Sequence, residues 1–182
     1  MPTSTSSRLQ VLITAAQISQ RVGELAADIT RDFSGEPVIL VGVLKGAAVF
    51  LSDLARKIEL DATFDFISVS SYERSQSTGE VQLLKDVDSS LAGRNVILVE
   101  DILDTGLTLT FLRKLFLARQ PRILKIAVLL DKLPRRCVPI QVDYSGFVIP
   151  DEFVVGYGTD YCERYRNLPD IRILPPELQD AL

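Results

Sequence analysis

The sequence contains no histidine, and its two cysteines are Cys137 and Cys162. The absence of histidine excludes a histidine-ligated zinc site and a Ser-His-Asp triad. Two cysteines are too few for a disulfide framework or for a four-cysteine metal site. A general base in this protein must therefore be a carboxylate, a lysine, a tyrosine or a cysteine.

Long apolar runs are also lacking. No apolar stretch reaches the ~20 residues that a membrane-spanning helix needs. Residues 1–7 are polar, without the basic start and apolar run of a signal peptide. We therefore expect a cytoplasmic protein with reduced thiols and no association with membranes. The net charge of −4 argues against a nucleic-acid binder, which normally has a basic surface, but it leaves room for a local basic pocket that binds a small phosphorylated ligand.

The length of 182 residues fits a single domain with a continuous core. The hydrophobic fraction of 47% and the charged fraction of 24% are typical of a soluble globular protein. We find no internal repeat, low-complexity tract or linker that would separate two domains. The sequence therefore predicts one domain over residues 1–182.

Short apolar segments alternate with segments of helical periodicity. Thr14 precedes the first helical segment and Gln17 follows three residues later, which is the spacing of a capping box; this helix is expected to end near Gly35. The other expected elements are strands at residues 37–44, 64–70, 95–99 and 122–130 and helices at residues 47–57 and 107–118. Strands that alternate with helices predict an α/β fold with a parallel, Rossmann-like twisted sheet flanked by helices.

After Asp131 the chain breaks into short strand-like pieces separated by proline, glycine and aspartate. These pieces are expected at residues 140–142, 147–149, 153–155 and 171–174. We expect a core at about residues 8–131 and a small hood at about residues 132–182, with a contribution from the N-terminus, that covers the sheet or its edge. Residues 81–85 are expected as a short strand, after a polar loop at residues 71–79.

Ligands of open α/β sheets bind at the carboxyl ends of the strands, and the strongest motif lies at one of them. At residues 96–108 an apolar strand runs into Glu100 and Asp101, and Asp-Thr-Gly-Leu-Thr then opens a helix. Backbone N–H groups at a helix N-terminus attract phosphate, and Gly106 lets the backbone approach closely. Two carboxylates would repel a phosphate alone, so they indicate a ligand with sugar hydroxyls and a divalent cation. The motif is neither a P-loop nor a dinucleotide fingerprint.

This segment resembles the phosphoribosyl pyrophosphate signature of type I phosphoribosyltransferases, and its Glu-Asp-Ile variant resembles the hypoxanthine-guanine branch. Further similar motifs follow in family order: residues 44–46 resemble the pyrophosphate loop, Ser71 and Tyr72 with residues 77–79 the mobile closing loop, and residues 129–132, 149–157 and 160–161 the base-binding hood. The resemblance extends roughly over residues 38–170. It implies a type I phosphoribosyltransferase fold and a Mg²⁺-dependent purine-salvage enzyme that converts hypoxanthine or guanine into IMP or GMP.

The resemblance also implies roles for the residues of the central motif. Glu100 and Asp101 would bind the ribose hydroxyls, directly or through Mg²⁺. Asp104 would be the general base that takes the proton from purine N7. The 5′-phosphate would be held by the start of the helix, at Thr105, Gly106, Leu107 and Thr108.

For the pyrophosphate, the resemblance implies contacts from backbone groups of Lys45 and Gly46 and from Arg166, with a strained or cis peptide before Lys45. Asp160, which belongs to the purine end of the site, would hold a second Mg²⁺. Ala47 follows Gly46 where the family usually has glycine or serine, and Leu107 replaces a frequent lysine. These two departures bear mainly on substrate affinity.

Three residues are implied to read the purine. Phe153 would stack on it, the backbone of Val154 would meet its edge, and Lys132 would donate a hydrogen bond to O6. The family further implies a homo-oligomer, either a dimer or a tetramer, with small-molecule substrates only.

Three alternatives remain open from the sequence. The first is a related transferase that uses xanthine or tolerates 6-oxopurines broadly. The second is a regulator that keeps the nucleotide-binding fold and binds RNA or DNA, which would need a basic face. The third is a catalytically inactive scaffold subunit, which the filled site positions disfavour.

Overall fold

The computed structural model describes residues 9–71 and 81–179. The closing loop expected around Tyr72 and residues 73–79 lies outside the described residues. Ser71, which was expected to begin this loop, is the last residue of a strand.

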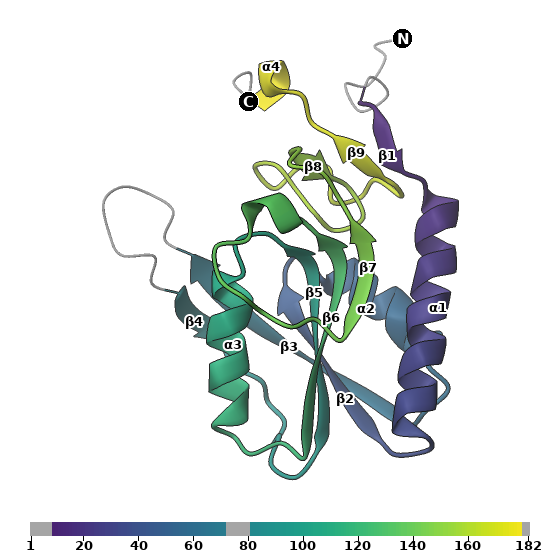
Figure 1. The fold of residues 1–182 in the computed structure, drawn as a ribbon, viewed down its shortest axis with the longest axis vertical. Coiled ribbons are helices and arrows are strands. Elements are labelled where there is room, and N and C mark those ends of the chain that lie inside the picture. The colour runs from purple at the N-terminus through teal and green to yellow at the C-terminus, as the bar shows by residue number, and fades with distance from the viewer. Residues whose placement is uncertain (1–8, 72–80, 180–182) are drawn as a thin grey trace.

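A six-stranded sheet forms the centre of the protein (Figure 1). Its strands are β2 (Val38–Leu44), β3 (Ala62–Ser71), β4 (Val81–Lys85), β5 (Asn95–Leu103), β6 (Ile123–Asp131) and β7 (Tyr144–Val148). They lie in the order β4-β3-β2-β5-β6-β7; β4 is antiparallel to its neighbour and all other pairs are parallel. The expected α/β fold with a mainly parallel sheet is therefore confirmed.

Helices cover both faces of this sheet. They are α1 (Ala15–Phe33), α2 (Ala48–Ala55) and α3 (Leu107–Leu117), and a short α4 (Pro176–Gln179) and a 3-10 turn η2 (Leu133–Arg135) lie outside the layers. The first helix begins at the expected capping box, in which Thr14 Oγ1 accepts from the backbone N–H of Gln17 and the Gln17 side chain accepts from the backbone N–H of Thr14. Described residues form no helix long and apolar enough to cross a membrane.

Successive residues of each buried strand supply two different cores, because side chains of a strand alternate between its faces. In β5, Ile97 and Val99 pack with α1 and α2, whereas Val96 and Leu98 pack with α3. This explains the continuous apolar runs in the sequence, because neither face of a strand buried on both sides contacts solvent.

A polar cluster fastens the C-terminal end of α1 to the edge of the sheet. The carboxylate of Asp32 accepts from Lys125 Nζ at 2.9 Å and from the Tyr144 hydroxyl at 2.8 Å. The ammonium of Lys125 also lies 5.1 Å from the centre of the Tyr144 ring. The hydrogen bonds from Lys125 and Tyr144 hold the pKa of Asp32 below its ordinary value. Lys125, which interrupts an otherwise apolar strand, is thus a structural residue.

We expect Lys125→Met to lower the free energy of unfolding by about 1–2 kcal/mol at pH 7, because it removes a partly buried charge pair and a cation–π contact. A depressed pKa contributes stability above the unfolded-state pKa of Asp32 and loses it as the pH falls through the folded-state pKa. The difference between variant and wild type should therefore shrink below about pH 4. Urea unfolding at pH 7 and pH 3.5 measures both quantities. Arg94→Met, which changes an exposed cation away from Asp32, is the control and should cost under ~0.5 kcal/mol.

A small antiparallel sheet lies beyond the carboxyl ends of the parallel strands (Figure 1). It contains β1 (Val11–Ile13), β8 (Val154–Val155) and β9 (Ile171–Ile173), with β9 in the middle. The N-terminal strand thereby joins the C-terminal part of the chain, and this small sheet holds Val154 over the end of the main sheet.

Two of the strand-like pieces behave differently from the expectation. The piece expected at residues 147–149 belongs to β7, which is the edge strand of the main sheet and starts at Tyr144. The piece expected as a strand at residues 140–142 is irregular. Its side chains Ile140 and Val142 pack against the core on the α3 side, so their apolar character reflects burial rather than strand pairing.

Candidate active site

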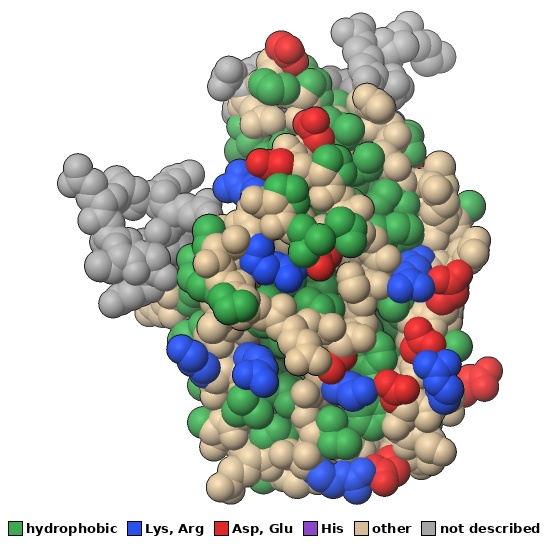
Figure 2. All heavy atoms as spheres, in the orientation of Figure 1, with side chains coloured by type: hydrophobic (Ala, Val, Ile, Leu, Met, Phe, Trp, Pro, Cys, Tyr) green, Lys and Arg blue, Asp and Glu red, His purple; other side chains and the backbone are tan. Residues whose placement is uncertain are grey.

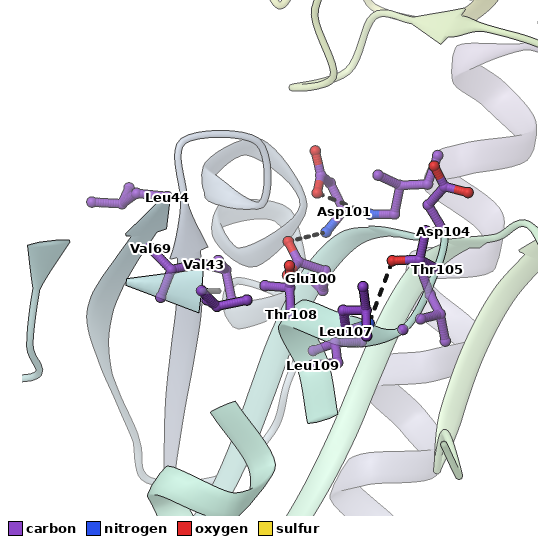
Figure 3. Close-up of a pocket in the computed structure, with 14 residues that line it drawn as sticks. Val43, Leu44, Val69, Glu100, Asp101, Asp104, Thr105, Leu107, Thr108 and Leu109 are labelled. Atoms are coloured by element: carbon purple, nitrogen blue, oxygen red, sulfur yellow. Dashed lines mark hydrogen bonds between the residues drawn. The ribbon is translucent and has the colours of Figure 1, made fainter. Parts of the chain in front are cut away.

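The candidate site lies at the switch point of the sheet. From β2 the chain continues to β3 on one side, whereas β5 lies on the other side of β2, and a crevice forms at such a point outside the carboxyl ends of the strands. A cavity of about 340 Å³ opens there. It is lined by the end of β2, the end of β5, the following turn and the start of α3, and Val69 and Val81 form part of its wall (Figure 3).

Two adjacent carboxylates occupy the floor of this cavity. Glu100 and Asp101 are the last polar side chains of β5 and are 7% and 9% exposed. Burial, reinforced by the neighbouring Asp101 carboxylate, raises the pKa of Glu100 well above its ordinary value, and burial also raises the pKa of Asp101. Two buried carboxylates without a compensating cation are unfavourable as anions. The pair therefore fits a site whose ligand brings hydroxyl donors or a divalent cation.

The turn between β5 and α3 presents a helix N-terminus to the same cavity. Gly106 is the N-cap, with φ at 87°, and has no side chain to cap the helix, while the Thr105 hydroxyl accepts from the backbone N–H of Leu107 at 3.4 Å. An L-residue rarely adopts this φ, so glycine suits the position. The turn is fastened from outside, because the Thr105 carbonyl accepts from the N–H groups of Cys137 and Val138. The N-terminus of α3 therefore presents backbone N–H groups to an anion, and Thr105 and Thr108 line the same cavity.

Asp104 stands between this turn and the hood. Its Oδ1 lies 3.1 Å from Arg135 Nε, yet the geometry is not that of a hydrogen bond, and Oδ1 is buried without a hydrogen-bond partner among the described residues. We regard the contact as a charge pair. A buried carboxylate oxygen with a free lone pair is the group that can accept a proton from a bound ligand.

The loop after β2 packs against Asp101. The peptide bond between Leu44 and Lys45 is cis, as the resemblance implied. Gly46 lies so close to Asp101 that a Cβ atom at this position would be 1.8 Å from Asp101 Oδ2. Any side chain here would displace the carboxylate, so glycine is required for the approach.

A loop between β8 and β9 brings the remaining charged groups. Arg166 contacts Asp160 Oδ1 at 2.8 Å and donates to the Gly158 carbonyl at 2.8 Å. Asp160 Oδ2 accepts from the N–H of Glu163. The positive charge of Arg166 acts on Asp101 and partly offsets the rise of the pKa of Asp101. Arg166 is therefore close enough to act electrostatically on Asp101, while Asp160 is bound within its own loop.

The hood places the three expected purine readers near the end of β6. The Lys132 side chain is 7% exposed, its backbone N–H donates to the Leu103 carbonyl at the end of β5, and its Nζ lies 3.5 Å from Asp151 Oδ1. Phe153 is 39% exposed and packs edge-on against Tyr161, which leaves much of its ring accessible. Val154 is buried and paired within the small sheet.

Of the expected metal ligands, the structure brings Glu100 and Asp101 together. Within residues 9–71 and 81–179, no three acidic or cysteine side chains gather into a preformed metal cluster, and Asp160 is engaged by Arg166. This arrangement fits Mg²⁺ better than a metal held by protein alone, because Mg²⁺ usually keeps waters and binds one or two carboxylates plus ligand phosphates.

Three residues of the site were not identified from the sequence. They are Arg135 beside Asp104, Asp151 beside Lys132 and Glu163 beside Lys45 and Arg166. Asp151 and Glu163 lie within or next to the motifs that resemble the hood. Their negative charge at these positions was the signal from which they could have been identified. Arg135 carried no signal, since its partner is 31 residues earlier in the chain.

Comparisons with known proteins agree with this geometry. Residues 12–162 match the phosphoribosyl transferase domain family. A hypoxanthine-guanine phosphoribosyltransferase of Staphylococcus aureus is 48% identical over 93% of this chain and 95% of its own length. A crystal structure of a hypoxanthine phosphoribosyltransferase from the same species has a TM-score of 0.92 at 47% identity and covers 98% of both chains. A hypoxanthine-guanine phosphoribosyltransferase structure from Bacillus anthracis has a TM-score of 0.87 at 51% identity and covers 91% of this chain and 98% of that one.

Proposed function

Since the chain belongs to the phosphoribosyltransferase family, and within it to the hypoxanthine-guanine phosphoribosyltransferases, we propose that it transfers the 5-phosphoribosyl group of phosphoribosyl pyrophosphate to N9 of hypoxanthine or guanine. The products are IMP or GMP and pyrophosphate. The observation that carries this proposal is the end of β5, where the buried pair Glu100 and Asp101 and the N-terminus of α3 meet in one cavity.

The phosphoribosyl end of the substrate fits the turn and the carboxylates. The 5′-phosphate binds the N–H groups at the start of α3 and the hydroxyls of Thr105 and Thr108, with Gly106 and Leu107 contributing backbone. The ribose hydroxyls bind Glu100 and Asp101. A ligand at both places is fixed at its two ends, which orients the anomeric carbon for displacement.

The purine lies under the hood. It stacks on the accessible ring of Phe153, its edge meets the backbone of Val154, and O6 accepts a hydrogen bond from Lys132. In the reaction the bond from the anomeric carbon to the pyrophosphate oxygen breaks and a bond to purine N9 forms. The N7 proton of the base passes to Asp104 Oδ1, which has no hydrogen-bond partner among the described residues, so the purine ring of the product carries no extra proton.

Mg²⁺, when bound, neutralises the leaving pyrophosphate. We propose that Glu100 and Asp101 would help to hold this ion and that Asp160 would help to hold a second Mg²⁺. All three residues supply hard oxygen atoms, which Mg²⁺ prefers. Lys45 and Gly46 present their backbone to the pyrophosphate, together with the guanidinium of Arg166.

We expect activity to require Mg²⁺ or Mn²⁺ and to be lost in excess EDTA, because the buried carboxylates and the phosphates need a common counter-charge. Glu100→Gln should raise the Mg²⁺ concentration needed for half-maximal rate by roughly tenfold or more. Glu152→Gln, an exposed hood carboxylate, is the matched control and should leave this concentration unchanged. Full turnover in excess EDTA would contradict the metal assignment. It would show that protein groups alone neutralise the phosphates of the substrate.

The nucleic-acid-binding alternative needs a basic face. On the face drawn in Figure 2, basic and acidic side chains of the described residues lie beside one another over the lower half of the molecule. This pattern and the net charge of −4 favour a small-molecule enzyme. We further propose that the protein is cytoplasmic and assembles as a dimer or tetramer; sedimentation of the purified protein measures the latter.

Phosphorus NMR of the purified protein with phosphoribosyl pyrophosphate, Mg²⁺ and hypoxanthine tests the reaction. We expect one pyrophosphate and one nucleotide phosphate to appear for each substrate consumed, and only when the base is present. Release of pyrophosphate and ribose 5-phosphate without a base would indicate a hydrolase. No consumption would favour the inactive scaffold.

A further inference from the structure

The carboxylate of Glu163 bridges the two cations nearest the pyrophosphate end of the site. Its Oε2 lies 3.0 Å from Lys45 Nζ, and its Oε1 lies 3.3 Å from an amino nitrogen of Arg166. Lys45 belongs to the loop after β2, and Arg166 belongs to the loop between β8 and β9. One negatively charged side chain thus joins the loop that packs against Asp101 through Gly46 and the loop whose Arg166 acts electrostatically on Asp101.

The backbone of its loop directs Glu163 to this place. The residue has a left-handed conformation, with φ at 64°, and its N–H donates to Asp160 Oδ2 at 2.8 Å. A non-glycine residue rarely adopts this conformation, and it persists where the surroundings impose it. Cys162, the residue before it, is left-handed as well. The turn therefore sets the direction in which the Glu163 side chain leaves the backbone, and its contacts with Lys45 and Arg166 set the position of the carboxylate.

Arg166 has one guanidinium hydrogen-bond donor that is not satisfied by the described residues. Its guanidinium donates to the Gly158 carbonyl and contacts Asp160 and Glu163, but its Nε is buried and has no hydrogen-bond partner among the described residues. A buried donor without an acceptor is costly, and a phosphate oxygen is a suitable acceptor for it. The contacts of Glu163 are different in kind: the side chains of Glu163 and Lys45 are 64% and 67% exposed, so their pairing is weak and easily exchanged.

We propose that Glu163 is an internal anion that holds Lys45 and Arg166 in the ligand-free protein and is displaced by the pyrophosphate group of the substrate or product. This inference rests on the proposed function. The carboxylate matches the charge sign and the two-oxygen geometry of a phosphate, so it keeps the cations in place. It also competes with the ligand and remains nearby as a like charge, which lowers pyrophosphate affinity and favours product release.

Removing the charge of Glu163 should therefore tighten binding. In Glu163→Gln the side chain keeps its size, and we expect Mg²⁺-pyrophosphate to bind about three- to tenfold more tightly, as measured by calorimetry, because two weak charge pairs no longer compete. KM for phosphoribosyl pyrophosphate should fall by a similar factor, and KM for hypoxanthine should stay the same. A side chain that merely supported the loop would give the opposite sign when replaced.

Three further variants separate competition at Lys45 and Arg166 from a general change in charge. Glu152→Gln removes an exposed hood carboxylate and should leave pyrophosphate affinity unchanged. In a Lys45→Met background the gain from Glu163→Gln should shrink, because one of the two contacts is already absent. Glu163→Asp, which retains the charge on a shorter side chain, should fall between wild type and Glu163→Gln.

Unchanged or weaker pyrophosphate binding in folded Glu163→Gln, with the melting temperature of wild type, would overturn the inference. Should Glu163→Gln fail to fold, Glu163→Asp decides, and affinity equal to or below that of wild type would overturn it. The proposed function is judged separately, because it fails only if wild type forms no nucleotide, and pyrophosphate titration needs no turnover.

Discussion

Lys132→Met is expected to lower kcat/KM for hypoxanthine and guanine and to reduce the ratio of these values to kcat/KM for adenine. Lys132 follows the buried strand β6, its side chain is 7% exposed, and its backbone N–H is held by the Leu103 carbonyl. The backbone of Lys132 is therefore held beside Leu103, the residue before Asp104, and its ammonium lies 3.5 Å from Asp151 Oδ1. An ammonium has three donors and no acceptor, so it can bond the O6 carbonyl but meets the 6-amino group of adenine donor to donor.

The size of the effect follows from the burial of Lys132. A charge-assisted hydrogen bond contributes about 1.5–3 kcal/mol, which is roughly 10- to 150-fold in kcat/KM. Adenine loses this bond and also leaves the buried donor unpaired, so discrimination against it can reach ~10⁴–10⁵-fold. Asp151, 3.5 Å from the ammonium, is the counter-charge that makes burial of Lys132 tolerable.

Competing kcat/KM values for hypoxanthine, guanine and adenine, measured on wild type and Lys132→Met, test this prediction. Lys114→Met, on the exposed side of α3, is the matched control and should behave as wild type. A variant with the same base preference as wild type would show that another group reads the 6-position, while the reaction itself would stand.

Asp104→Asn should lower kcat by about 10²–10⁴-fold and leave IMP affinity largely intact. The amide keeps the shape of the carboxylate but cannot accept the N7 proton. Because the chain has no histidine, and Asp104 Oδ1 is a buried acceptor beside the turn with no hydrogen-bond partner in the described part of the chain, we expect no other group to take over.

Single-turnover measurements are needed here, because product release can hide a change in the chemical step. IMP binding by the same variant serves as the internal control for folding. A single-turnover rate close to that of wild type would exclude Asp104 as the general base, and loss of IMP binding would show that the residue positions the nucleotide instead.

The part of the site that could be predicted from the sequence lies within single segments. The end of β5, the turn and the start of α3 form one continuous motif, so their arrangement follows from local structure alone. The apolar strands before Lys45, Asp104 and Lys132 predicted a parallel sheet, and the carboxyl ends of parallel strands meet at one edge.

Pairs between distant segments could not be predicted in this way. Arg135 meets Asp104 because the N–H groups of Cys137 and Val138 fasten the following segment to the Thr105 carbonyl, a contact that no spacing reveals. Glu163 reaches Lys45 through a left-handed turn, which a non-glycine residue seldom signals in a sequence. Such contacts depend on the tertiary path of loops rather than on periodicity.

Apolar alternation was a poor guide after β6 for a related reason. Residues 140–142 alternate like a strand, but Pro139 lacks an N–H group and their side chains fill a gap on the α3 side of the core. The strand forms later, from Tyr144, where the side chain of Asp143 accepts from the Ile126 N–H and sets the register beside β6.

Nucleotide formation by the purified protein with phosphoribosyl pyrophosphate, Mg²⁺ and each purine base in turn tests the central claim most directly. We predict that hypoxanthine or guanine is converted with a kcat/KM at least ~10⁴-fold above that of adenine, with xanthine measured alongside. Equal use of adenine and hypoxanthine would contradict the assignment of this site to 6-oxopurines.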